Sequence, residues 1–190
     1  NIITKKSANA GELQFTAGSN DRRPYNFNYG LQNAKLSLNM YANKVEQDAY
    51  LRNSDYDNEQ VGFNLSYELN NTDTLRVKYD YQQLKRGLVV QNVPGSADFD
   101  SRYPATPIGD SFANYQGKLP GDGSYTKIFR NNFNVSWNSN RTNGSDSITY
   151  WKNYEKQREH NVNAGKVMFD RYNVTDKSSG VMYKGNAKVN

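Results

Sequence analysis

Apolar and polar residues alternate with a period of two along most of the chain. Residues 59–69 give the clearest case, because their apolar side chains would all lie on one face of a strand and their polar side chains on the other. The apolar members are Val61, Phe63, Leu65, Tyr67 and Leu69. A cluster of turn formers follows at residues 70–73, and alternation resumes at Leu75. Two alternating runs around a short polar turn predict a β-hairpin.

The same alternation recurs before and after this hairpin. By this template we expect about nine strands, with weaker ones at residues 12–18, 25–29 and 162–172. The runs that begin at residues 75 and 125 are longer than the roughly 5–6 residues of most globular strands. A β-sandwich also alternates, but a membrane-spanning strand needs roughly 9–11 residues. The lengths therefore favour an all-β, antiparallel, up-and-down transmembrane barrel.

The predicted links between strands differ in length. Short polar links are expected at residues 30–33, 70–73, 139–145 and 173–179, and longer ones at 46–58 and 91–123. The longest contains Pro94, Pro104, Pro107 and Pro120, and a structureless stretch of that length usually has a function. Short turns at one end and long loops at the other are typical of outer-membrane barrels. Short loops near residues 20–23 and 158–161 depart from this rule.

The composition fits a sheet with one wet face. Mean hydropathy is -0.98 and only 35% of residues are hydrophobic, yet the chain has 15 Tyr and 8 Phe. Disordered chains are poor in aromatic and β-branched residues, whereas barrel strands carry an apolar and a polar face. We expect Trp137, Trp151, Tyr150 and Tyr154 to lie at membrane interfaces, where Tyr and Trp concentrate.

Several kinds of chemistry are excluded or disfavoured. The chain has no cysteine and one histidine, His160, so it cannot form a Cys/His metal cluster or nucleophile by itself. Asp98 and Asp100 lie in the long loop, where nothing nearby marks an active site. The net charge of +5 is scattered and makes no dense basic stripe for nucleic acid. We therefore expect no enzyme, no cofactor and no metal site.

The first residues carry a family resemblance. The motif Asn-Ile-Ile-Thr-Lys-Lys at residues 1–6, followed by alternating Leu13 and Phe15 and by Gly18-Ser19, resembles the plug-to-barrel junction of TonB-dependent outer-membrane receptors. Residues 34–41, 48–50, 59–67 and 73–81 resemble that family's third to fifth strands in order and spacing. The resemblance implies that residues 1–6 end a plug domain and that 7–190 form part of a barrel of about twenty-two strands.

The resemblance also implies a function and a topology. It implies TonB-dependent import of a scarce solute across the bacterial outer membrane: a metal chelate such as a siderophore, a vitamin, or a small saccharide or peptide. TonB would act through a plug segment that precedes residue 1, and further strands or a partner chain would complete the barrel among outer-membrane lipids. A passive porin, or a structural or adhesive barrel, is the alternative, although the motif at residues 1–6 argues against it. A soluble β-sandwich or β-rich enzyme is a third.

The two faces and the long loops have distinct expected roles. Val61, Phe63, Leu65, Leu75, Val77 and Tyr79 should face lipid, and Asn64, Ser66, Lys78 and Asp80 the lumen. Both long loops follow strands of the same direction, which in this family places them outside the cell. Arginine with aromatic rings suits rigid or anionic ligands. The candidate ligand contacts are Tyr50, Arg52, Tyr56, Arg102, Tyr103 and Tyr115, and ordinary loop packing is the alternative for each.

Overall fold

The computed structural model describes residues 9–19, 21–106, 120–163 and 166–187. The junction motif at residues 1–6 and the candidate contact Tyr115 lie outside the described residues. The described residues form eight strands. These are β1 (Ala10–Phe15), β2 (Arg23–Gln32), β3 (Leu36–Gln47), β4 (Tyr56–Glu68), β5 (Asp73–Gly87), β6 (Tyr125–Arg141), β7 (Gly144–Asn163) and β8 (Lys166–Ala187).

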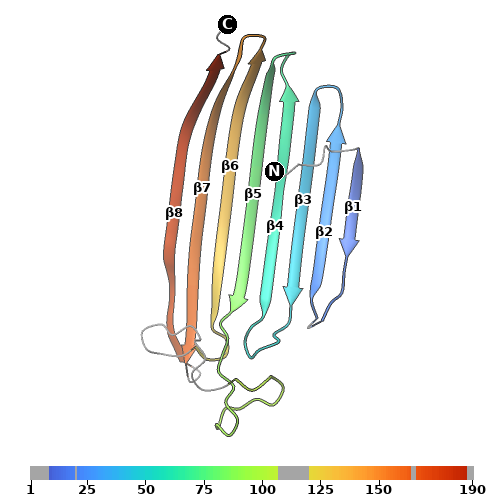
Figure 1. Ribbon diagram of the computed structural model, residues 1–190. Helices are drawn as coiled ribbons and strands as arrows, with labels where there is room; N and C mark the ends of the chain where they lie inside the picture. Colours follow the sequence, from blue (N-terminus) through green and yellow to red (C-terminus); the bar gives the residue numbers. More distant parts are fainter. Residues whose placement is uncertain (1–8, 20, 107–119, 164–165, 188–190) are drawn as a thin grey trace.

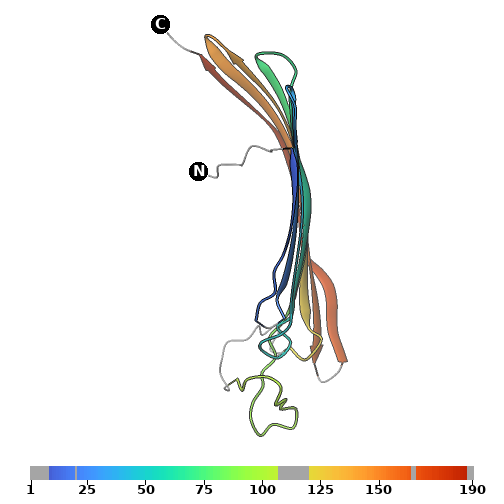
Figure 2. The ribbon, with the colours of Figure 1, turned by 90° about the vertical axis from the view of Figure 1, so that its right-hand side faces the viewer.

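All eight strands belong to one antiparallel sheet in which each strand pairs with its neighbour in sequence, from β1 to β8 (Figure 1). Seen edge-on, the sheet is a single twisted and bent layer, with the long loop extending beyond one end (Figure 2). The prediction of an all-β antiparallel meander is therefore confirmed. Within the described residues, no helix is long and apolar enough to cross a membrane.

Asparagine side chains shape two of the tight turns. At the turn between β4 and β5, the Asn70 side-chain oxygen accepts hydrogen bonds from the backbone N–H groups of Thr72 and Asp73, both at 2.8 Å. Between β2 and β3, the Asn33 side chain accepts from the N–H groups of Lys35 and Leu36. Such local bonds are the reason that asparagine favours turns. The hairpin predicted around residues 70–73 is thus confirmed.

The last third of the chain forms two long strands where we expected three shorter ones. The predicted link at residues 173–179 lies inside β8, and the predicted loop at 158–161 lies inside β7. Thr175, Lys177 and Ser179 pair directly with Lys156, Tyr154 and Lys152. In this part of β8 almost every residue is polar, whichever face its side chain occupies, so the alternation that identifies a strand disappears and the sequence reads as a loop.

The links have different lengths at the two ends of the sheet. The links after β2, β4 and β6 contain residues 33–35, 69–72 and 142–143, whereas those after β3 and β5 contain residues 48–55 and 88–124. The two long loops therefore leave the same end of the sheet, as predicted (Figure 1). The link from β7 to β8 is short although it lies at this long-loop end.

The strand register separates the two faces as expected. Directly paired residues share a face, and Phe63 pairs with Tyr79 and Leu65 with Val77, while Asn64 pairs with Lys78. Continued across the sheet, the Leu65 row is almost wholly aliphatic. It contains Leu31, Leu38, Leu65, Val77, Val135, Tyr150 and Val181.

Rows rich in aromatic residues lie on both sides of the Leu65 row. Toward the short turns, the next row contains Tyr67, Trp137 and Tyr183. Toward the long loops, the next rows contain Tyr29, Phe63, Tyr79, Phe133, Phe27, Tyr81 and Tyr154. We call these rows together the apolar band. Two residues expected at interfaces do not lie at a border of the band: Trp151 pairs with Asn134 and so lies on the polar face, and Tyr150 lies in the central Leu65 row.

The sheet has almost no core of its own. Among the described residues Val90, in the long loop, is the one buried hydrophobic residue, with 5% of its surface exposed. Large apolar side chains of the band remain open, such as Val61 at 46%, Ile148 at 44% and Val181 at 67%. Exposed apolar surface of this extent marks an interaction surface. This face of the sheet is therefore a candidate interaction surface.

Candidate functional site

Arg52 joins the two long loops at their common end of the sheet. It lies in the link between β3 and β4, and only 9% of its surface is exposed. Its Nε donates to the Asp122 carboxylate at 2.9 Å, and its Nη1 donates to the Asp98 carbonyl oxygen at 2.6 Å. The hydrogen bonds that Arg52 donates to Asp122 raise the pKa of Arg52, although burial opposes this. Arg52 therefore connects residues 48–55 with the described parts of the long loop, residues 88–106 and 120–124.

Asn53 closes the base of the long loop. Its Nδ2 donates to the carbonyl oxygens of Leu88 and Ser124, both at 2.7 Å, and its Oδ1 accepts from the Gly123 N–H at 3.0 Å. Leu88 and Ser124 are the first and last residues of the loop. Asn53 has a φ of 60°, in the left-handed region that asparagine tolerates better than most residues. One side chain thus holds together two points that are distant in sequence.

A second asparagine organises the interior of the long loop. Asn92 is fully buried, and its Nδ2 donates to the carbonyl oxygens of Asp100, Tyr103 and Pro104 at 2.8–3.2 Å. The Asn92 Oδ1 accepts a hydrogen bond from the Asp100 N–H at 2.8 Å, and the backbone carbonyl oxygen of Asn92 accepts one from the Thr106 N–H at 2.9 Å. A buried amide costs little when all its partners are present. Residues 92–106 therefore have a defined conformation and are not a loose connection.

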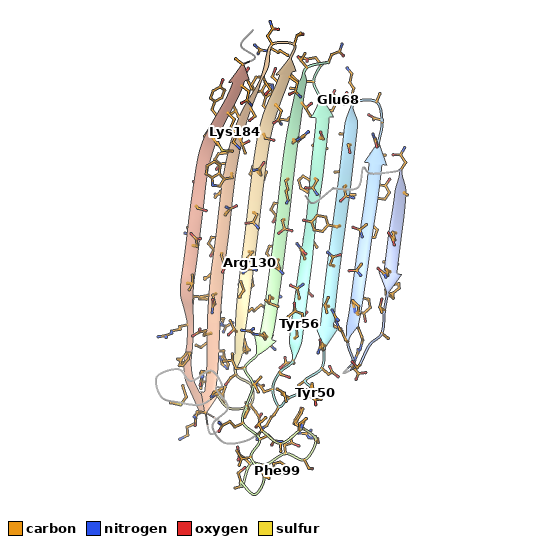
Figure 3. All side chains as sticks on the ribbon, in the orientation of Figure 1. Tyr50, Tyr56, Glu68, Phe99, Arg130 and Lys184 are labelled. Atoms are coloured by element: carbon orange, nitrogen blue, oxygen red, sulfur yellow. The ribbon has the colours of Figure 1, made fainter. Side chains whose placement is uncertain are left out.

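The structure assigns different positions to the predicted ligand contacts. Tyr50 is 58% exposed in the shorter loop, while Tyr56, predicted in that loop, is the first residue of β4. The Arg52 guanidinium already forms an ion pair with the Asp122 carboxylate, so it is less available to a ligand than we predicted. Figure 3 shows Tyr50 beyond the strands at the long-loop end and Tyr56 at the end of β4.

Arg102 and Tyr103 lie together on the surface of the long loop. Arg102 donates to both Asp100 oxygens, with Nη2 to Oδ2 at 2.6 Å, and its guanidinium lies 5.7 Å from the Tyr103 ring centre. The Arg102 hydrogen bonds lower the pKa of Asp100 to about 2. Asp100 and, more weakly, Asp122 raise the pKa of Arg102. Because Arg102 remains 79% exposed, it could still reach a ligand in solution.

A pocket of about 560 Å³ lies between the two loops and the end of β7. Its wall includes Arg52, Val90, Asp98, Asp122 and Asn163. That volume is within the range of roughly 300–1,000 Å³ that small-molecule sites occupy. Arg52 is the one predicted contact that lines it. The charged side chains named in this wall, Arg52, Asp98 and Asp122, are already paired with one another.

The polar face of the sheet carries a hydrogen-bonded network that sequence reasoning did not identify. The Tyr41 hydroxyl donates to Asp80 at 2.6 Å, and the Gln60 amide donates to the same oxygen at 2.8 Å. The Tyr41 side chain on β3 crosses over Gly62 on β4 to contact Asp80 on β5. A Cβ atom at position 62 would lie 2.5 Å from the Tyr41 ring, so a larger residue there would block this path. This glycine therefore makes room for the contact.

A second hydrogen-bonded cluster lies on the same face, around Arg130, which Figure 3 places on β6. Arg130 Nε donates to Glu155 at 2.7 Å and Nη1 to Gln82 at 3.3 Å, and Gln82 in turn donates to Asn58 at 2.8 Å. This face can therefore contact water or a polar partner along its length. In the described residues, no group of three or more His, Asp or Glu side chains could hold a metal ion.

The chain gives no match to protein-family models, to curated proteins or to solved structures.

Proposed function

We propose that the chain is a section of the wall of an outer-membrane β-barrel that imports a scarce solute with energy from TonB. The observation that carries the membrane part is the apolar band on one face of a single-layered sheet. From Leu75 to Tyr81 along β5 the band extends about 20 Å, at roughly 3.3 Å per residue. Outer-membrane barrels have an outward apolar band roughly 25 Å tall with aromatic residues at both borders.

The polar face and the meander order support the same proposal. A barrel wall needs lipid on one face and water or a plug on the other, and the two hydrogen-bonded clusters around Asp80 and Arg130 suit the wet side. Closed barrels alone leave no edge in lipid, so further strands must join β1 and β8. The specific family is proposed from the motif at residues 1–6, which distinguishes a plugged importer from an open porin.

The experiment is uptake by cells that make the complete protein, with and without TonB. A labelled ferric hydroxamate, cobalamin and a maltodextrin are the probes. Accumulation of at least one probe that disappears without TonB supports active import. Entry of all three irrespective of TonB would favour the porin. Failure of the protein to enter the outer-membrane fraction would overturn the barrel itself.

The loop unit around Arg52 is proposed to form part of the ligand-facing mouth. Deletion of residues 94–120 removes Asp98, which contacts Arg52, and part of the pocket wall. We expect assembly of the barrel to persist and affinity for the transported probe to fall. Unchanged affinity and uptake in a correctly assembled deletion variant would contradict the role of the loop but leave the barrel proposal intact.

A further inference from the structure

Cations gather on the banded face of the sheet, at the border of the apolar band that is nearer the long loops. Lys85 pairs directly with Lys127, and Lys127 pairs directly with Arg158, so three cations stand side by side on β5, β6 and β7. Lys156 lies on the same face in the next row toward the band, and Lys177 lies one row further, where it pairs with Tyr154. We call Lys85, Lys127, Lys156, Arg158 and Lys177 the basic cluster.

Carboxylates neutralise only the two ends of the three-cation row. Lys85 Nζ lies 3.8 Å from Asp55, and Asp57 is its direct cross-strand partner. Arg158 Nη2 lies 2.6 Å from Asp170. In the part of the chain that the structure describes, Lys127, Lys156 and Lys177 have no carboxylate within ion-pairing distance. Like charges directly opposite each other destabilise a sheet, so an external anion would relieve this arrangement.

Aromatic rings support these three lysines and connect them to the apolar band. Lys127 lies 5.0 Å from the Phe129 ring centre, Lys156 lies 3.4 Å from that of Tyr172, and Lys177 lies 5.8 Å from that of Tyr154. Tyr154 belongs to the outermost row of the band. Long side chains can therefore rest along rings while their ammonium groups face an anion at the membrane border.

We propose that the basic cluster binds the phosphate groups of membrane lipid headgroups, a proposal that rests on the membrane orientation proposed above. Acyl chains would cover the apolar band, and the phosphates of the same lipids would then lie at the height of Lys127 and Lys156. Juxtamembrane lysines attract anionic lipids through this combination of apolar contact and charge. The partner is a lipid because the apolar surface and the unpaired cations adjoin on one face. A single lipid could therefore contact the first with its acyl chains and the second with its phosphate.

The test compares lipid binding to the complete protein, purified in a neutral detergent, by native mass spectrometry with phosphatidylglycerol and phosphatidylcholine. The test variant changes Lys127, Lys156 and Lys177 to Gln. The matched control changes Lys35, Lys78 and Lys184 to Gln, which removes the same charge at the β2–β3 turn and on the polar face. We expect the test variant to lose phosphatidylglycerol affinity at least about tenfold, and the control to change by less than about twofold.

Each other outcome contradicts a specific part of the proposal. Equal affinity for the two lipids, or equal losses in test and control variants, would overturn the basic cluster as a lipid site while the barrel still stands. Inorganic phosphate that binds as tightly as phosphatidylglycerol and is equally sensitive to the test variant would replace the lipid with a free anion. A complete protein that stays soluble without detergent would overturn the membrane proposal and this one together.

Discussion

Asn53 shows how much one side chain can contribute at a crossing of two loops. Its φ of 60° suits asparagine, and its amide satisfies two carbonyl oxygens and one N–H at the base of the long loop. Hydrogen bonds of this kind contribute about 0.5–1.5 kcal/mol each, and their loss leaves buried partners unsatisfied. The loops are therefore stabilised by polar contacts far more than by apolar packing.

The first prediction changes this residue. Asn53→Ala should destabilise the loop unit by about 2–4 kcal/mol, because it removes three hydrogen bonds and strains a residue with positive φ. Asn53→Gly separates the two effects, since it relieves the backbone but restores no bond. Limited proteolysis of residues 88–124 in the complete protein is the measurement. Cleavage of the Ala and Gly variants at the wild-type rate would contradict the assigned role.

The second prediction concerns pH and Asp100. The Arg102 hydrogen bonds lower the pKa of Asp100 from 3.8 to about 2 in the folded loop. A carboxyl group with a lowered pKa stabilises the fold above its unfolded pKa, and this contribution is lost as pH falls through the folded value. Protection of the Thr106 amide from hydrogen exchange, corrected for intrinsic rates, should therefore decrease between about pH 4 and pH 2. In Asp100→Asn this decrease should be absent, and a persistent decrease would assign it to another group.

At the scale of strands, alternation identifies an element only where the two faces differ. Residues 59–69 and 75–81 cross the apolar band, and there the sequence predicted both strands and which side chains share a face. Residues 173–179 of β8 carry polar side chains even where their rows belong to the band, since Lys177 pairs with Tyr154 and Ser179 with Lys152, so polarity no longer alternates there. That part of β8 could not be separated from a turn by its sequence.

The loops were harder to predict than the strands for a physical reason. Their approximate lengths and their common end of the sheet follow from strand parity, and both were predicted. Arg52 was predicted as a ligand contact, a prediction that stays open, but its carboxylate partners Asp98 and Asp122 are 46 and 70 residues away in sequence and could not be predicted. Asn92 looks like any polar loop residue until its carbonyl partners are brought around it. No local pattern encodes contacts of this kind.

The third prediction tests which face of the strands meets lipid. Leu65 lies in the aliphatic row, and Leu65→Arg should cost roughly 2–4 kcal/mol if that row lies near the bilayer midplane. Ser66→Arg places the same charge on the opposite face, where Arg76 is its cross-strand partner. The cost there should stay below about 1 kcal/mol. Folding yield of the complete protein into lipid vesicles measures both, and equal yields would contradict the assignment of faces.

At the scale of the whole molecule, strand parity sets the two ends of the sheet apart. The loop at residues 88–124 and the turn at residues 69–72 lie at opposite ends (Figure 1). Because the chain contains no cysteine, single introduced cysteines in this chain can report each end without interference from it.

The fourth prediction uses that property. Ser101→Cys in the long loop should react with a membrane-impermeant maleimide on intact cells, because the loop is proposed to be extracellular. Asn71→Cys, in the β4–β5 turn, should react only after the outer membrane is opened. Labelling of both variants is followed by mass shift of the complete protein. The reverse pattern would invert the proposed topology. Labelling of both variants on intact cells would contradict the proposal that a membrane separates the two ends of the sheet.

The unequal links also bear on the order in which the sheet can assemble. Thr142 and Asn143 alone separate β6 from β7, so that hairpin can form with little loss of chain entropy. Pairing of β5 with β6 must instead close residues 88–124, which costs about 2 kcal/mol more by loop-closure entropy. We therefore expect strands β1–β5 and strands β6–β8 to pair first as two separate groups. Pairing of β5 with β6, which joins the two groups, should be the slow step. The Asn53 hydrogen bonds hold Leu88 and Ser124 together at the base of the loop. Formation of these contacts would therefore limit the rate at which β5 pairs with β6.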